Sequence, residues 1–347
     1  MHDKKVLIAM SGGVDSSVSA LLLKKAGYTI RGITMCLGVT YEDRRKCCSR
    51  ESINDAKRIC AQLGIEHHLI DFSKELEQYV IKDFIEKYKN GMTPNPCVEC
   101  NRILKFEKLI KIAKASGFDY IATGHYAKIA NQNGSLFLAK AKDKKKDQSY
   151  FLYSIKREYL KDIIFPLSDL TKEEVRKIAK EENLHVNDKE QSQDICFIKN
   201  DYREFLKNYM EEKEGFFIDK EGNILGKHKG IHNYTIGQRH GLGLGYHKTL
   251  YVIRIISDKN LIVLGDEKDL YSSKLVAGNL NLFIDDKNFT CTAKIRYNHK
   301  PAHCDVKIKN NLAYVSFKEK QRAITPGQSV VFYKDELVLG GGIIQEV

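Results

Sequence analysis

The segment K-K-V-L-I-A-M-S-G-G-V-D-S-S fills residues 4–17 and decides the fold of the N-terminal part of the chain. Its apolar run predicts a buried strand, and the amphipathic stretch Val18–Ala26, which stops at Gly27, predicts a helix. The turn between them is short and rich in glycine and hydroxyl groups. Such a turn aims backbone N–H groups and a helix N-terminus at one point, which favours phosphate. It lacks the lysine of a Walker P-loop, and the alternative is an ordinary glycine turn with a Ser/Asp helix cap.

Short apolar runs alternate with helical patterns through about the first 200 residues. Further strands are predicted at residues 28–37, 67–70 and 120–123, and helices at 49–63, 73–89, 101–116 and 171–183. The alternation predicts an α/β fold, a doubly wound and mostly parallel sheet with helices on both faces. Ligands of such sheets bind beyond the carboxyl ends of the strands, where both Ser11 and Gly124-His125 are expected.

The composition changes after residue 200. Beyond a helix predicted at Tyr202–Met210, residues 201–271 are rich in glycine and histidine and predict a small mixed β domain. Apolar and polar residues alternate from residue 272 onward, for example at Cys291, Ala293 and Ile295, which predicts a C-terminal β-barrel. The expected domains are therefore 1–200, 201–271 and 272–347.

The formal net charge of +12 over 347 residues favours a polyanionic partner such as nucleic acid, with a merely solubilising surface as the alternative. Nine cysteines without a secretory signal indicate a reducing compartment. No apolar run is long enough to cross a bilayer, so we expect a cytoplasmic protein without membrane partners.

Three cysteines stand out. Cys97 and Cys100 lie in T-P-N-P-C-V-E-C-N (residues 93–101), a turn that enters a helix, where a thiol is expected to have a lowered pKa. Cys196 follows in S-Q-D-I-C-F (residues 192–197). A C-x-x-C pair fits a redox pair, half of a zinc site or a pair of cluster ligands. Because Cys47 and Cys48 are adjacent, which is poor chelate geometry, structural zinc is disfavoured.

The remaining cysteines and histidines have simpler interpretations. Cys36, Cys60, Cys291 and Cys304 are expected to be small core residues. His228, His232, His240 and His247 are expected in turns and on the surface, because their spacing fits no ordinary metal site. His125 follows a predicted strand and is expected to bind a ligand rather than to transfer a proton.

The loop at Ser11 resembles the pyrophosphatase loop of enzymes that split ATP into AMP and pyrophosphate. With it stand A-T-G-H-Y-A (residues 122–127), K-D-Q-S-Y-F-L (146–152), Y-T-I-G-Q-R-x-G-L-G (234–243) and the two cysteine motifs. Short R-Y and P-G-Q segments follow near the C-terminus. This ordered set resembles the tRNA-specific 2-thiouridylase family over essentially the whole chain.

The resemblance implies a role for each matching residue. ATP would be held by Ala9, Met10, Ser11, Gly12, Gly13, Val14, Asp15, Ser16 and Gly124, with Met35 lining the adenine pocket through its main chain. Cys100 would be the nucleophile, and Cys196 would carry the sulfur as a persulfide. Asn95, Pro96 and Cys97 would meet the target base. Contacts to tRNA would come from His125, Lys146, Asp147, Gln148, Arg296, Tyr297 and Gln328.

The implied reaction is ATP- and Mg²⁺-dependent 2-thiolation of the wobble uridine of tRNAs of the Lys, Glu and Gln type. A cysteine desulfurase or a sulfur-relay protein would donate the sulfur to a monomeric enzyme, and a Cys100–Cys196 disulfide would form. Well-known members carry Asp where this chain has Cys97, so Cys97, Cys100 and Cys196 could instead hold a [4Fe–4S] cluster.

Two other functions share parts of this pattern. An ATP-pyrophosphatase ligase that amidates a small molecule would have the same loop, but it needs neither a basic β-barrel nor three cysteines. A non-catalytic RNA-binding module would not need the intact loop from Ser11 to Ser16.

Overall fold

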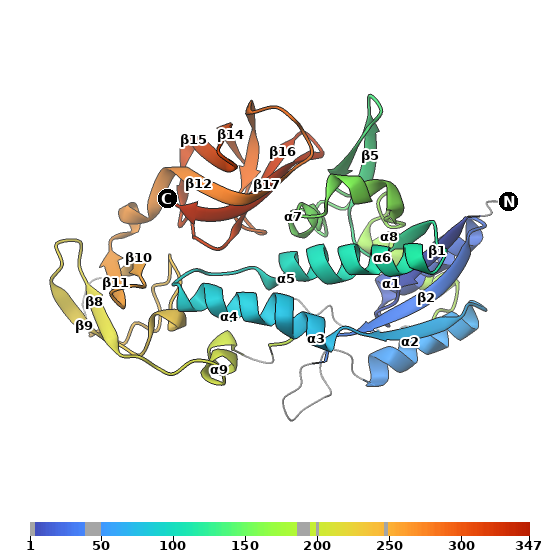
Figure 1. The fold of residues 1–347 in the computed structure, drawn as a ribbon, viewed down its shortest axis with the longest axis horizontal. Helices are drawn as coiled ribbons and strands as arrows, with labels where there is room; N and C mark the ends of the chain where they lie inside the picture. The colour runs from blue at the N-terminus through green and yellow to red at the C-terminus, as the bar shows by residue number, and fades with distance from the viewer. Residues whose placement is uncertain (1–3, 39–49, 186–194, 199–200, 246–248) are drawn as a thin grey trace. The chain divides into compact units, whose positions relative to one another are not determined.

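The computed structural model describes residues 4–38, 50–185, 195–198, 201–245 and 249–347. The chain divides into two compact units (Figure 1). Unit 1 comprises Met1–Val80, Cys97–Phe197 and Asp335–Leu339, and unit 2 comprises Ile81–Pro96, Ile198–Lys334 and Gly340–Val347. Among the described residues, no helix is both long enough and apolar enough to span a bilayer.

Unit 1 is built on a five-stranded parallel sheet. Its strands are β1 (Lys5–Ala9), β2 (Thr29–Cys36), β3 (His67–Asp71), β4 (Tyr120–Ala122) and β7 (Ile163–Ile164), in the order β3-β2-β1-β4-β7. All four neighbouring pairs are parallel, which confirms the predicted sheet. The order reverses between β1 and β4, and a crevice at the carboxyl ends of the strands is expected at this reversal.

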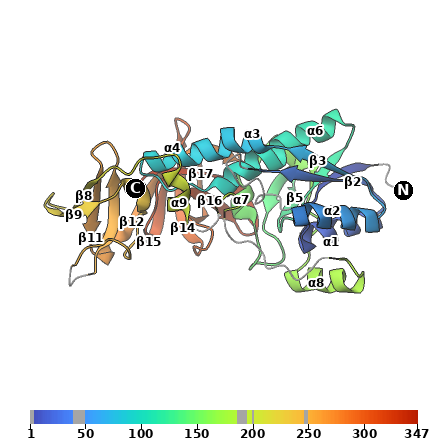
Figure 2. The same cartoon turned by 90° about the horizontal axis from the view of Figure 1, so that it is seen from below.

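Helices bury the apolar side chains of this sheet. Val6 and Ile8 of β1 pack in one cluster with residues of α1 (Val14–Lys25), α2 (Arg50–Gln62) and α8 (Lys172–Glu181). Helix α8 packs beside α1, as Figure 2 shows. It begins with the predicted capping box, in which the Thr171 hydroxyl accepts from the Glu174 N–H and the Glu174 carboxylate accepts from the Thr171 N–H.

The helices predicted at residues 73–89 and 101–116 are present but interrupted. The first consists of α3 (Ser73–Glu75), a π-helical stretch (Leu76–Ile81) and α4 (Lys82–Lys89). The second consists of α5 (Pro96–Glu99), a π-helical stretch (Cys100–Lys108) and α6 (Leu109–Ala115). An apolar period near 3.6 residues does not separate the two helix types, so the sequence could not predict these stretches.

A hairpin of unit 1 was not predicted. Strands β5 (Lys128–Gln132) and β6 (Ser135–Ala139) form it through Asn133-Gly134, both in the left-handed region. The K-D-Q-S-Y motif is typical of a loop that enters a helix, and the short helix α7 (Ser149–Leu152) is present there.

The middle of unit 2 contains a small four-stranded sheet. Its strands are β8 (Gly215–Ile218), β9 (Ile224–His228), β10 (Tyr251–Ile256) and β11 (Leu261–Gly265), in the order β10-β11-β8-β9. Helix α9 (Tyr202–Lys207) precedes it.

The prediction of surface histidines is wrong at two positions of unit 2. His228 and His232 are buried, and the His228 ring lies edge-on to Phe217 in the core of this sheet. Spacing along the chain does not reveal how deep a side chain lies. His247 lies outside the described residues.

Six strands close the predicted barrel, drawn in orange and red in Figure 1. They are β12 (Tyr271–Leu282), β13 (Asn288–Lys294), β14 (Ala302–Lys309), β15 (Leu312–Arg322), β16 (Ser329–Lys334) and β17 (Leu337–Glu346), and β12 pairs with both β15 and β17. Cys291 and Cys304 face each other across β13 and β14 and are buried, as predicted for core residues.

Candidate active site

The loop between β1 and α1 lies at the carboxyl edge of the sheet, next to the reversal of strand order. Gly12 has a φ of 74°, and a Cβ on it would come within 2.2 Å of the Ser52 carbonyl oxygen. Gly13 is the N-cap of α1 and has no side chain that could cap the N–H groups of the first turn. These donors suit an anionic ligand such as a phosphate group.

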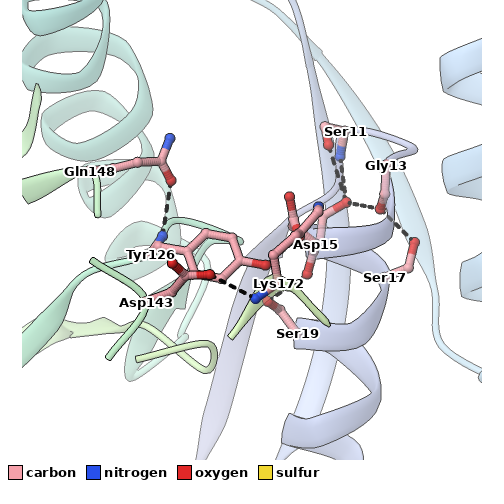
Figure 3. A network of polar contacts seen from close by, with 10 residues as sticks. Ser11, Gly13, Asp15, Ser17, Ser19, Tyr126, Asp143, Gln148 and Lys172 are labelled. Carbon is pink, nitrogen blue, oxygen red and sulfur yellow. Dashed lines mark hydrogen bonds and ion pairs between the residues drawn. The ribbon is translucent and has the colours of Figure 1, made fainter. Parts of the chain in front are cut away.

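Serine hydroxyls hold this loop in shape (Figure 3). The Ser16 Oγ accepts from the Ser11 N–H at 3.2 Å and donates to the Gly13 carbonyl at 3.0 Å. The Ser17 hydroxyl donates to the same carbonyl at 2.9 Å, and the Ser19 hydroxyl donates to the Asp15 carbonyl at 2.8 Å. In the sequence, these hydroxyl groups indicated a phosphate-binding loop. In the structure, they form hydrogen bonds with backbone atoms of the loop and of α1.

Two residues that sequence analysis missed bind the Asp15 carboxylate. The Tyr126 hydroxyl donates to Asp15 Oδ1 at 2.8 Å, and the buried Lys172 ammonium donates to the same oxygen at 2.6 Å (Figure 3). Burial and the Asp15 charge raise the pKa of Tyr126 far above its usual range. Lys172 opens α8, where the only sequence signal is the capping box, so nothing local pointed to this ion pair.

The other residues expected to bind nucleotide gather at the same edge of the sheet. Gly124 follows β4, and a Cβ on it would come within 2.8 Å of the Ser16 nitrogen. The Met10 carbonyl accepts from the Thr34 hydroxyl at 2.8 Å, and Met35 is the next residue of β2. The fold thus brings Ala9–Ser16, Met35 and Gly124 to one edge, and their contact with ATP stays a prediction.

His125 and the K-D-Q motif make mostly internal contacts. Burial, assisted by Lys105, lowers the pKa of His125 to about 3, so its ring is neutral at physiological pH. Gln148 accepts from the Tyr126 N–H at 2.9 Å, and Asp147 accepts from the Ser149 hydroxyl at 2.7 Å. These bonds shape the loop that holds Lys146, and its contact with RNA stays a prediction.

The expected RNA-binding residues of unit 2 also stabilise backbone. Arg296 donates to the Ala323 carbonyl at 3.0 Å. Gln328 donates to the carbonyls of Thr93 at 2.9 Å and Pro94 at 3.3 Å. Gln328 therefore fixes the turn that leads to Asn95 and Pro96. The ring of Tyr297 lies 5.3 Å from the Lys294 ammonium.

The three cysteines interact within unit 1. Cys100 is buried and Cys97 half-buried, while Cys196 is exposed. Burial raises the pKa of Cys100 to about 11 and also raises that of Cys97, with smaller contributions from Cys196. The expectation of a lowered thiol pKa is therefore wrong, because the cost of desolvating a thiolate exceeds the effect of the helix N-terminus.

A metal site is not evident at these cysteines. In the part of the chain that the structure describes, no group of three or more His, Cys, Asp or Glu side chains is arranged to hold a metal ion. The adjacent Cys47 and Cys48 lie outside the described residues.

Replacing Lys172 by Met should lower the free energy of unfolding by about 3 kcal/mol, because the Asp15 charge loses its buried partner. Lys128→Met is the control, since the Lys128–Asp169 pair is exposed and should contribute less than about 1 kcal/mol. Urea denaturation measures both. Equal losses in the two variants would show that Lys172 does not anchor the loop.

Iodoacetamide at pH 7 should alkylate Cys196 at least about tenfold faster than Cys100, since Cys196 is exposed and Cys100 is a buried thiol. Labelling of Cys100 should rise with pH towards 11, as its thiolate forms. Peptide mass spectrometry follows each residue, with the buried Cys60, whose pKa is also about 11, as a control for unfolding. Equal rates at Cys100 and Cys196 at pH 7 would contradict this assignment.

Known proteins match the whole length of the chain. Residues 4–200 match the family described as tRNA methyl transferase HUP domain, residues 203–266 its PRC-barrel domain, and residues 272–344 the aminomethyltransferase beta-barrel domain. Solved structures are only distantly similar: a glutamine-dependent NAD⁺ synthetase from Acinetobacter baumannii gives a TM-score of 0.35 at 15% identity, over 52% of this chain and 29% of that one.

Curated relatives are much closer. The tRNA-specific 2-thiouridylase MnmA 1 of Syntrophus aciditrophicus is 47% identical, over 99% of this chain and 93% of the relative. MnmA of Halothermothrix orenii is 47% identical and that of Clostridium beijerinckii 45%, each over 99% of both chains. With this identity along almost its entire length, the chain belongs to the tRNA-specific 2-thiouridylase family.

Proposed function

We propose that this protein uses ATP to replace the C2 oxygen of the wobble uridine of tRNA by sulfur. The observation that carries the proposal is the electrostatic interaction of Cys196 with Cys97 and Cys100. Cys196 is far from the other two in sequence, and all three lie in the unit that also holds the loop at Ser11. A sulfur carrier and a resolving thiol must meet at one site.

The first proposed step is adenylation. The C2 oxygen of the uracil attacks the α-phosphorus of ATP, an O–P bond forms, and pyrophosphate leaves. The N–H groups of the first turn of α1, which begins after Gly13, would stabilise the phosphate charge, and the hydroxyl of Ser16 keeps the loop in its shape. A poor electrophile, the C2 carbonyl carbon, thereby gains AMP as a leaving group.

The second proposed step transfers sulfur. The terminal sulfur of a Cys196 persulfide attacks C2 and AMP leaves, so the base is joined to Cys196 through two sulfur atoms. The Cys100 thiolate then attacks Cys196 Sγ; the S–S bond breaks, 2-thiouridine is released, and a Cys100–Cys196 disulfide forms. An external dithiol must reduce this disulfide before the next cycle.

The resemblance implies two inorganic groups, Mg²⁺ and a [4Fe–4S] cluster, and each can be compared with the residues present. Mg²⁺ would enter with the phosphates of ATP, because the Asp15 carboxylate already binds Lys172 and Tyr126. A [4Fe–4S] cluster would need Cys97, Cys100 and Cys196 as thiolate ligands. Burial raises the pKa of Cys97 and Cys100, so the iron would have to displace their protons on binding.

The remaining features of the proposal follow from the substrate. The net charge of +12 suits tRNA, here one with a wobble uridine of the Lys, Glu or Gln type. The exposed Cys196 suits delivery of sulfur by a cysteine desulfurase or a relay protein. We also propose a cytoplasmic monomer with domains at residues 1–200, 201–271 and 272–347.

Two alternatives remain as outcomes of experiment. An amidating ligase would exchange pyrophosphate into ATP without tRNA, and an RNA-binding module would release no AMP with bulk tRNA. Nucleoside mass spectrometry of tRNA after reaction with ATP and a sulfur donor tests the proposal directly, since 2-thiouridine must appear.

Gly12→Ala should lower tRNA-dependent release of AMP by at least about a hundredfold, because the new Cβ would meet the Ser52 carbonyl at 2.2 Å and displace the loop. Gly27→Ala has a similarly positive φ but no atom within 4 Å of the new Cβ, and it should keep near wild-type activity. AMP release by Gly12→Ala at the rate of Gly27→Ala would exclude this loop from adenylation.

Cys97→Ser should retain most 2-thiolation activity, because Cys97 is only a neighbour in the persulfide relay. Cys100→Ser and Cys196→Ser should abolish thiolation and keep adenylation. Anaerobic purification, iron and sulfide analysis and thiolation assays decide the matter. About four irons per chain, lost together with activity in Cys97→Ser, would replace the relay by a cluster mechanism.

A further inference from the structure

Unit 2 contains a cavity of about 760 Å³ between α9 and the turn that follows β9. Five residues of the motif Y-T-I-G-Q-R-H-G-L-G (residues 234–243) line it, and none of them has a role in the thiolation proposed above. The volume is in the range of sites that hold a nucleotide-sized ligand.

The motif builds a fixed wall for this cavity. Gln238 accepts from the Thr235 N–H at 3.2 Å and donates to the His240 carbonyl at 2.9 Å, so its amide holds the turn. Gly237 and Gly241 supply the positive φ values of 90° and 72° that this path requires. His240 Nε2 accepts from Arg239 Nε at 2.8 Å, which leaves Nδ1 as the other polar atom of the ring.

Three cationic side chains line the same cavity. Arg203 donates from Nε to the Asn233 carbonyl at 2.9 Å and from Nη1 to the Asp201 carboxylate at 3.1 Å, and these bonds fix the guanidinium. The guanidinium also contacts the Tyr202 side chain, and Arg203 Cζ lies 5.1 Å from the centroid of that ring. Lys207 pairs with Glu212 at 3.3 Å in an exposed pair that an anion can displace. Lys229 is exposed and has no ion pair in the described part of the chain.

A tyrosine provides a further hydrogen-bonding group. The Tyr202 ring stacks on Tyr88, with centroids 4.9 Å apart. Its hydroxyl is buried among polar groups of Thr235, Arg203 and Tyr88 but makes no hydrogen bond of good geometry with them. A buried hydroxyl without a partner is costly, and a bound polar group would satisfy it.

We propose that this cavity binds one phosphate-bearing nucleotide of the tRNA, other than the uridine that is thiolated; the inference rests on the proposed function. Arg203, Lys207 and Lys229 outnumber the two carboxylates of the lining, Glu204 and Glu212, and suit a phosphate. The Tyr202 hydroxyl and the His240 ring suit the polar edge of an unpaired base. No cysteine lines the cavity, so it cannot hold the reacting uridine.

The test measures the affinity of the full-length protein for tRNA without ATP, over a range of salt concentrations. Lys229→Ala should weaken binding about three- to tenfold and reduce the slope of log K against log salt by about 1. Tyr202→Phe should weaken it about threefold without changing this slope. The matched control is Lys227→Ala, an exposed lysine of β9 that pairs with Glu214 outside the cavity, and it should bind as wild type.

Each result has a defined meaning. Wild-type affinity and salt slope in both Lys229→Ala and Tyr202→Phe would overturn the inference. Wild-type tRNA binding combined with slower sulfur delivery from the donor protein would also overturn it, because the cavity would then bind protein. Absence of 2-thiouridine from the wild-type reaction would instead refute the proposed function, while the affinities still test the cavity.

Discussion

The ion pair between Asp15 and Lys172 is the constraint on which the loop region depends. It joins the first turn of α1 to the first turn of α8, and the Tyr126 hydroxyl joins the same oxygen from the chain that follows β4. Taking both charges out of water costs several kcal/mol, and the pair repays this only if every bond is made. The network therefore holds the loop in one position, and losing either partner would leave a buried charge unpaired.

Two glycines, which have no side chain, matter as much to this loop as the polar contacts do. At Gly12 the loop passes within van der Waals contact of α2, and at Gly124 the end of β4 passes against the first turn of α1. Each approach leaves no room for a Cβ. A crevice is expected where the strand order reverses between β1 and β4, and both glycines lie at this edge of the sheet.

The sequence predicted regular elements well because apolar periodicity is a local signal. The parallel sheet, the capping box at Thr171 and the closed barrel are present as expected. The hairpin at Asn133-Gly134 carried a readable turn signal that was overlooked. The partner of Asp15 and the pKa of Cys100 could not be predicted, since both depend on residues that only the folded chain brings together.

Cys100 is buried and Cys196 is exposed, so the two cysteines of the proposed relay differ in reactivity. Because burial raises its pKa to about 11, Cys100 is a thiol at pH 7 and, in the proposed relay, would resist oxidation and premature attack on the persulfide. The exposed Cys196 can accept sulfur from a protein donor. Resolution then requires a proton to leave Cys100 once the adenylated base is bound. Lys105, whose charge already favours that thiolate, is the cation in place to assist.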